Sequence, residues 1–251
     1  MVGTAYRVAL CAFFLGAFLF GLGCSSVNSP DAANGSDPKI VNVSQTITVR
    51  QGQIFDGKGK LYDWTGEGDC SQVEGMPPMF KLASNSALRN LRMRNAPDGI
   101  HIKGSNVLVD NIVNLDVCED AISIKLDENK SIPTDIIISN SKFYDCEDKA
   151  IQITRGKNLL IANNEFHRCA KAIRVKENAS DIRFDNNKVY DAKIAIKVTG
   201  GSGTATGNLI DGAKVAIWAE QNGSFTDKGG NQLRRVGEPI RETEGGTVIV
   251  E

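Results

Sequence analysis

The chain has 251 residues, of which 41% are hydrophobic, 24% charged and 6% aromatic, and its formal net charge is −1. This composition excludes a collagen, a low-complexity chain and a disordered charged tail. The lack of a basic surplus also argues against nucleic acid as a partner.

Residues 1–23 carry one basic residue, Arg7, followed by an uninterrupted apolar run. The run has about the length of a signal-peptide core and is marginal for a membrane span. Because Cys24 follows at once and opens a polar stretch, the segment resembles a bacterial lipoprotein signal, with Cys24 as the lipidated first mature residue. Gly21 departs from that signal, which usually carries leucine there, so plain secretion and an uncleaved anchor stay open.

We therefore expect a signal peptide over 1–23, a flexible polar tether over 24–39, and a secreted, periplasmic or cell-surface protein with an outer-membrane or cell-surface lipid anchor. Disulfides form in such compartments. The cysteines beyond the signal allow two bridges of unassigned connectivity, or serve as buried apolar side chains. They are Cys70, Cys118, Cys146 and Cys169.

A short phrase of the type Ala-Ile-X-Ile returns six times. It begins at Gly99, Ala121, Ala150, Ala172, Ala195 and Ala216. The intervals are 22, 29, 22, 23 and 21 residues, and an insertion at 127–134 accounts for the long one. Each repeat contains short β-rich runs with period-two alternation and no helical stripe, so one repeat cannot bury its apolar face alone. The sequence predicts an all-β, right-handed parallel β-helix (β-solenoid) over 40–236, with coils of about 22 residues spaced about 4.8 Å apart, and a polar C-terminal tail over 237–251.

A column of asparagines precedes the phrase by nine or ten residues. Its members are Asn90, Asn111, Asn140, Asn163 and Asn186. Their spacing predicts a ladder at a turn, in which each side-chain amide bonds the next coil.

Alternation also assigns charges to one outward face. Four carboxylates from three adjacent coils meet at one edge of this face, namely Asp98, Glu119, Asp120 and Asp148. The rest of the face is cationic and includes Lys149, Lys171 and Arg174. Crowded carboxylates repel unless something binds between them, and their hard oxygen donors suit calcium. The alternative is a solvated turn in which each acid pairs with a neighbouring lysine.

Six short motifs follow one another along the chain in the order in which a known family carries them. They are Phe55-Asp-Gly-Lys-Gly-Lys, Glu74-Gly-Met-Pro-Pro-Met-Phe, Asp98-Gly-Ile-His, Val117-Cys-Glu-Asp-Ala, Asp148-Lys-Ala-Ile-Gln and Lys171-Ala-Ile-Arg. Over about residues 46–236 the chain resembles the family 3 polysaccharide lyases, which are small secreted pectate lyases with a parallel β-helix. The resemblance implies calcium-dependent β-elimination of polygalacturonate.

The resemblance also implies roles for single residues. It places calcium ligands at Asp98, Glu119, Asp120 and Asp148, basic catalytic groups at Lys149, Lys171 and Arg174, and substrate-binding groups at Glu74 and Lys125. The outward lysines Lys103 and Lys176 would line a groove for sugar acids, or are simply solvated. The insertion after Asp127 and the tail depart from the family, and both could alter subsites or chain-length preference.

We predict a monomeric calcium-dependent pectate lyase that cleaves de-esterified (1,4)-α-D-galacturonan in pectin and gives unsaturated oligogalacturonides. Lys149 is the expected base, with an alkaline optimum, because it adjoins the expected ligand Asp148. Arg174 would hold the substrate carboxylate with help from Lys171. Two other classes stay open: a β-helix glycoside hydrolase acting on an acidic polysaccharide, and a non-catalytic lipid-anchored glycan-binding protein.

Overall fold

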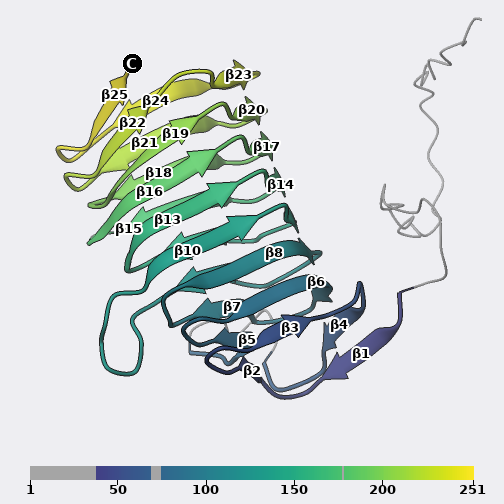
Figure 1. Cartoon of the computed structure of the whole chain (residues 1–251). Coiled ribbons are helices and arrows are strands. Elements are labelled where there is room, and N and C mark those ends of the chain that lie inside the picture. Colours follow the sequence, from purple (N-terminus) through teal and green to yellow (C-terminus); the bar gives the residue numbers. More distant parts are fainter. Residues whose placement is uncertain (1–37, 69–74, 177) are drawn as a thin grey trace, which may run out of the picture. The chain divides into compact units, whose positions relative to one another are not determined.

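The computed structural model describes residues 38–68, 75–176 and 178–251. These residues form stacked β-coils without a helix, and the strands follow one another up the stack in chain order (Figure 1). The predicted right-handed parallel β-helix is therefore confirmed. In this part of the chain no helix is long and apolar enough to span a membrane. The predicted signal, Cys24 and Glu74 lie outside the described residues.

Two sheets contain all of the strands. The first has nine strands: β2 (Ile47–Val49), β5 (Pro78–Leu82), β7 (Asp98–Ile102), β9 (Asp120–Ile124), β12 (Lys149–Ile153), β15 (Lys171–Lys176), β18 (Ile194–Thr199), β21 (Val215–Glu220) and β24 (Glu238–Glu242). The second has sixteen: β1 (Ile40–Val43), β3 (Ile54–Asp56), β4 (Leu61–Trp64), β6 (Ala87–Arg94), β8 (Val107–Asn114), β10 (Thr134–Ser139), β11 (Lys142–Tyr144), β13 (Gly156–Ala162), β14 (Glu165–His167), β16 (Ala179–Asp185), β17 (Lys188–Tyr190), β19 (Ser202–Thr206), β20 (Leu209–Asp211), β22 (Ser224–Asp227), β23 (Gln232–Arg234) and β25 (Thr247–Val250).

The second sheet divides into two arms beyond β8. One arm runs through β10, β13, β16, β19, β22 and β25, and the other through β11, β14, β17, β20 and β23. A coil such as β12–β13–β14 therefore presents three faces, one from the nine-stranded sheet and one from each arm. Each strand pairs in parallel with the equivalent strand one coil away, so equivalent residues form columns along the stack.

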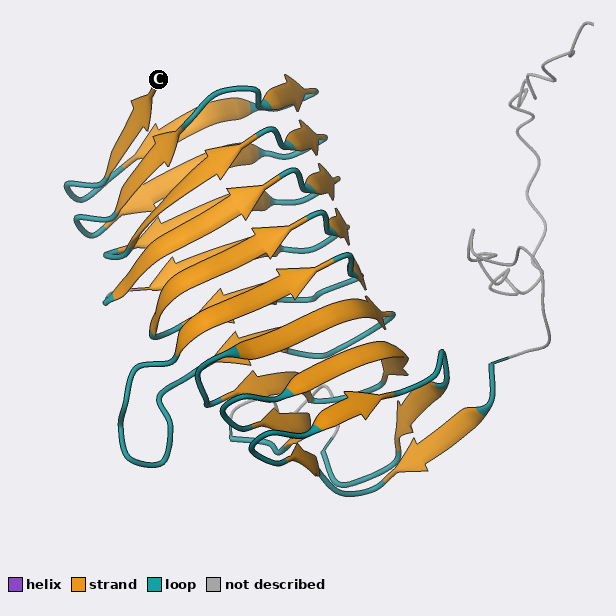
Figure 2. Ribbon diagram, in the orientation of Figure 1, coloured by secondary structure: helices purple, strands orange, loops and turns teal. Residues whose placement is uncertain are grey.

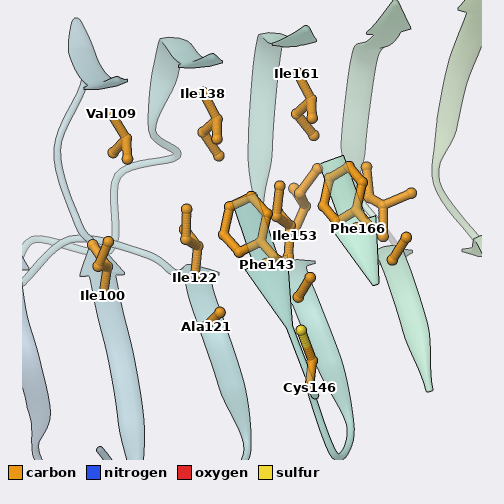
Figure 3. Close-up of a cluster of buried hydrophobic side chains, with 14 of the residues drawn as sticks. Ile100, Val109, Ala121, Ile122, Ile138, Phe143, Cys146, Ile153, Ile161 and Phe166 are labelled. Carbon is orange, nitrogen blue, oxygen red and sulfur yellow. The ribbon is translucent and has the colours of Figure 1, made fainter. Parts of the chain in front are cut away.

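The core consists of such columns on the inner side of each sheet. Ile100, Ile122, Ile151 and Ile173 occupy paired positions on successive strands and are completely buried. Figure 3 shows Ile100 and Ile122 side by side, with Phe143 and Phe166 on coils further along the stack. The alternation of apolar and polar residues thus placed the isoleucines inward, as predicted. The stack is tight, because a Cβ at Gly99 would lie 2.3 Å from the carbonyl oxygen of Ala121.

The predicted asparagine column forms the bend between strands. All five asparagines have φ between 52° and 58°, the left-handed region that asparagine tolerates better than most residues. Only part of the predicted ladder forms here: Asn111 donates to Asn90 Oδ1 at 2.9 Å, whereas Asn140 donates to Asp110 instead.

The continuous ladder begins one residue after Asn163, includes the residue after Asn186 and continues for two further coils. Its members are Asn164, Asn187, Asn208 and Asn231, of which the first three are buried. Asn187 Oδ1 accepts from the backbone N–H of Asn164 at 2.9 Å and from its side chain at 3.1 Å. Asn187 Nδ2 donates to the Ile161 carbonyl at 2.8 Å and to Asn208 Oδ1 at 3.2 Å. The ladder therefore satisfies buried polar groups that no strand hydrogen bond reaches.

Residues 237–251, predicted as a polar tail, belong to the solenoid. Within them β24 pairs with β21 and β25 pairs with β22, both in parallel. The polar composition of this segment did not reveal its strands, because the last coil of a stack buries few side chains and so needs few apolar residues.

The coils are also linked covalently. Cys146, after β11, forms a disulfide with Cys169, after β14, across one coil step of 23 residues. Cys118 is disulfide-bonded as well. Cys70 lies outside the described residues.

We expect Asn187→Ala to lower the free energy of unfolding by about 3 kcal/mol, because it leaves the buried N–H groups of Asn164 without an acceptor. Urea unfolding followed by circular dichroism measures this. Asn186→Gly is the matched control, because glycine adopts the left-handed backbone of Asn186, and it should change stability by less than about 1 kcal/mol. Equal effects of the two substitutions would contradict the role of the ladder.

Candidate functional site

The predicted charged residues gather on the outward face of the nine-stranded sheet, over β7, β9, β12 and β15. Asp120, Lys149 and Lys171 occupy one column at the start of their strands, and Asp98 begins the preceding strand β7. The parallel register therefore turns residues 22 to 29 positions apart in the chain into neighbours on adjacent coils.

Three of the four predicted calcium ligands form one anionic group. Asp98 and Asp120 are buried, with 3% and 1% of their surface exposed. Burial, followed by the charges of Asp98 and Asp120, raises the pKa of Glu119 from 4.5 to about 7. Burial also raises the pKa of Asp120, although Lys149 and Ser123 oppose it. Burial and the neighbouring carboxylates thus both favour the protonated form of Glu119.

Neutral and basic side chains orient these carboxylates. Ser123 Oγ donates to Asp120 Oδ2 at 2.6 Å, and Gln152 Nε2 donates to the same oxygen at 2.8 Å. His101 Nε2 lies 2.7 Å from Asp98 Oδ2. Lys125 Nζ lies 3.1 Å from that ring nitrogen and 3.6 Å from Asp98 Oδ2.

Lys149 lies buried between two carboxylates, with 4% of its surface exposed. Its Nζ is 3.1 Å from Asp120 Oδ1 and also donates to Asp148 Oδ2. Burial alone would lower the pKa of Lys149, but the charges and hydrogen bonds of Asp120 and Asp148 raise it above the ordinary value. The ammonium form is therefore favoured at neutral pH.

Asp148, the fourth predicted calcium ligand, is engaged by lysines. Lys171 Nζ donates to Asp148 Oδ1 at 2.6 Å, and Lys149 takes the other oxygen. Although burial acts in the opposite direction, these two lysines lower the pKa of Asp148. Asp148 thus fixes the positions of the two lysine side chains.

Arg174 has a guanidinium donor that no described residue uses. It occupies the column of outward residues that also contains Gln152 and Lys197. Its Nε is buried without a hydrogen-bond partner, and its guanidinium forms no ion pair, among the residues that the structure describes. A planar guanidinium with unpaired N–H donors suits a carboxylate ligand, which it can bind through two parallel hydrogen bonds.

The other predicted substrate-binding residues lie apart from this centre. Lys103 follows β7, and Lys176 ends β15, three coils further along the face. Among the predicted substrate-binding residues that the structure describes, Lys125 is the one that contacts the carboxylates, through Asp98. Sequence reasoning missed His101, Ser123 and Gln152 as orienting residues, although they occupy one outward column and that column was the available signal.

The anionic group formed by Asp98, Glu119 and Asp120 suits a hard cation in its charge and in its oxygen donors. Asp98, Glu119 and Asp120 supply oxygen donors, and burial together with the charges of Asp98 and Asp120 raises the pKa of Glu119. Two features oppose a ready-made site: Asp98 and Asp120 already accept hydrogen bonds, and the described residues contain no group of three or more His, Cys, Asp or Glu side chains arranged to hold a metal. Binding a cation here would require some of these oxygens to reorient.

Fold and site together define a parallel β-helix protein with a face of carboxylates, lysines and an arginine that no described residue pairs. The pectate lyase family model matches residues 31–223, and the chain belongs to the pectate lyase family. The prediction of a polysaccharide lyase is thereby confirmed at the level of the family.

Several known proteins are similar to parts of the chain. A probable pectate lyase F of Aspergillus flavus is 32% identical over 150 residues, which are 58% of this chain and 59% of that protein. A polygalacturonase of Fusarium fujikuroi is 27% identical over 53% of this chain and 39% of its own length. The chain thus spans less than two thirds of these curated relatives. An alginate lyase of Paenibacillus sp. str. FPU-7 shares the fold, with a TM-score of 0.53 at 13% identity over 85% of this chain and 93% of the other.

The raised pKa of Glu119 predicts a pH-dependent stability. Between about pH 4.5 and 7 the folded protein holds a proton on Glu119 that the unfolded chain has lost, so this contribution to stability disappears as the pH rises through 7. In chelator, urea unfolding at pH 5 and pH 8 should show a smaller loss of stability for Glu119→Gln than for the parent protein. The exposed control Glu67→Gln should keep the parent's pH dependence, and an unchanged slope in Glu119→Gln would contradict the assignment.

Proposed function

We propose that this protein is a pectate lyase that cleaves de-esterified (1,4)-α-D-galacturonan by β-elimination and requires calcium. The observation that carries the proposal is the arrangement of Lys149, Lys171 and the unpaired Arg174 next to three crowded carboxylates, in a chain that belongs to the pectate lyase family. The names of the curated pectate lyase relatives support the same substrate class.

The reaction has a simple balance. A base removes the proton from C5 of a galacturonate, the electron pair of the C5–H bond forms the C4–C5 double bond, and the C4–O4 bond breaks. The leaving oxygen takes a proton, so the products are a new reducing end and a 4,5-unsaturated uronide. No water is consumed, which distinguishes this reaction from hydrolysis.

We assign each cationic residue a role in the reaction from the groups that surround it. Arg174 binds the carboxylate of the reacting sugar through its free donors, which stabilises the negative charge that develops when C5 loses its proton. Lys149 takes the proton, and Asp120 and Asp148 hold its Nζ in place. Lys171 keeps Asp148 oriented. Because the pKa of Lys149 is raised, a free amine is abundant only in alkaline solution.

Calcium would be held by Asp98, Glu119 and Asp120, with Asp148 at the edge of this group. When bound, it supplies a Lewis acid that withdraws charge from the substrate carboxylate. The crowded carboxylates and the raised pKa of Glu119 support this part of the proposal.

Export and lipid anchoring at Cys24 complete the proposal. They rest on the sequence of residues 1–24 alone. Metabolic labelling with a radioactive fatty acid, compared between the parent chain and Cys24→Ser, tests them.

The first test is the release of unsaturated uronide from polygalacturonate, followed by absorbance near 235 nm at alkaline pH. We expect the absorbance to grow with calcium and to stop in excess chelator, because the carboxylate group then lacks its cation. A folded protein that gives no absorbance but releases reducing ends would be a hydrolase. One that binds polygalacturonate without turnover would be a glycan-binding protein.

The base is tested by Lys149→Arg, which keeps the positive charge between Asp120 and Asp148 but loses no proton below about pH 12. We expect kcat to fall by a factor of at least about 100, with loss of the rise in activity toward alkaline pH. Arg174→Lys should lower kcat and raise KM but leave the pH profile unchanged. Circular dichroism and urea unfolding establish that both variants fold. A Lys149→Arg enzyme with the parent's pH profile would exclude Lys149 as the base.

A further inference from the structure

The insertion between β9 and β10 covers part of the same outward face. It runs from Lys125 to Pro133 and projects from the stack (Figure 2). Asp127 orders the loop internally: its Oδ1 accepts from the N–H of Ser131 at 2.6 Å, and its carbonyl accepts from the N–H of Lys130 at 3.1 Å. Glu128 then accepts a hydrogen bond of 2.6 Å from Lys81, on β5. The loop therefore reaches back across two coils.

A cavity of about 410 Å³ lies between this loop and the first coils. Arg50, Lys81 and Lys103 line its floor, and Asp127 and Glu128 line the loop side. The cavity therefore has three cations and two carboxylates in its walls.

These charges do not all cancel one another. Glu128 is bound by Lys81, and the Asp127 carboxylate is used within the loop. Neither Arg50 nor Lys103 has an ion-pair partner among the described residues, whose salt bridges at this end of the sheet involve Lys81, His101 and Lys125. The cavity thus offers an arginine and a lysine that form no ion pair with a described residue, although the charge of Lys103 helps to lower the pKa of Glu128.

The two cations belong to the outward column that enters the candidate site. The pairings Thr48↔Lys81 and Lys81↔His101 set the register of β2, β5 and β7. Two residues after each of these outward positions come Arg50, Ala83 and Lys103, and the next strand continues the column with Lys125. Lys125, Lys103 and Arg50 therefore share one column, interrupted by Ala83, that leads from the anionic group to the cavity beneath the loop.

We propose that Arg50 and Lys103, beneath the 125–133 loop, form a distal subsite that binds the carboxylate of a uronate several sugars away from the bond that is cleaved. The proposal rests on the proposed function. From the coil of Lys149 to that of Arg50 there are four coil steps, or about 19 Å, which only an oligomeric substrate spans. The loop, fixed by Glu128 and Lys81, closes the groove at this end.

The test compares KM for saturated oligogalacturonates of three and six sugars, with the parent enzyme, Arg50→Ala and Arg50→Lys. We expect Arg50→Ala to raise KM for the longer oligomer about tenfold, the loss of one charge-assisted hydrogen bond, and to leave KM for the trimer and kcat unchanged. Arg50→Lys should recover part of the affinity. Lys157→Ala, which removes an exposed cation on β13 in the other sheet, is the matched control and should change neither KM.

A second variant should change KM in the opposite direction. Glu128→Gln keeps an oxygen that Lys81 can bind but removes a negative charge from the cavity, so KM for the six-sugar oligomer should fall. Equal effects of Arg50→Ala on both oligomers, no effect on either, or a higher KM in Glu128→Gln would overturn the distal subsite. Failure of the proposed function is distinct, because the parent enzyme would then form no unsaturated product from any oligomer.

Discussion

Hydrogen bonds between coils are the constraint on which the rest of this molecule depends. A coil closes no hydrogen bonds of its own along its strands, so its backbone groups pair with the coil before and the coil after. Where the chain bends and strand pairing fails, the asparagine ladder from Asn164 to Asn231 takes over the same task. Left-handed residues immediately before them, such as Asn163 and Asn186, turn the backbone so that the next side chain points inward.

The same constraint creates the charged face. Because the register is fixed by the core isoleucines, a substitution of one outward residue changes the charge at one coil without moving its neighbours. Charges of opposite sign can therefore be placed one coil apart, as with Asp120 and Lys149, which lie 3.1 Å apart at their charged atoms. The anionic group at β7 and β9 and the cations at β12 and β15 form two zones of one continuous surface.

The sequence was sufficient to predict the columns but not the contacts within them. Period-two alternation and the 21- to 29-residue repeat predicted the solenoid, the buried isoleucines and the proximity of Asp98, Glu119 and Asp120. The partner of each charged group depends on the length and conformation of the side chains, which the repeat pattern does not give. Asp148, for example, accepts hydrogen bonds from Lys149 and Lys171 and does not join the other three carboxylates. The ladder was assigned one residue too early, because asparagine serves both as a left-handed turn residue and as a buried amide, and the spacing is the same for both.

The disulfide between Cys146 and Cys169 has a consequence for how the molecule comes apart. In a linear stack the outermost coils have one neighbour each, so fraying starts at the ends and moves inward. Cys146 precedes Asp148 by two residues, and Cys169 precedes Lys171 by two. The covalent link therefore joins the two coils that carry Asp148, Lys149, Lys171 and Arg174, and these coils remain neighbours after hydrogen bonds toward either end have opened.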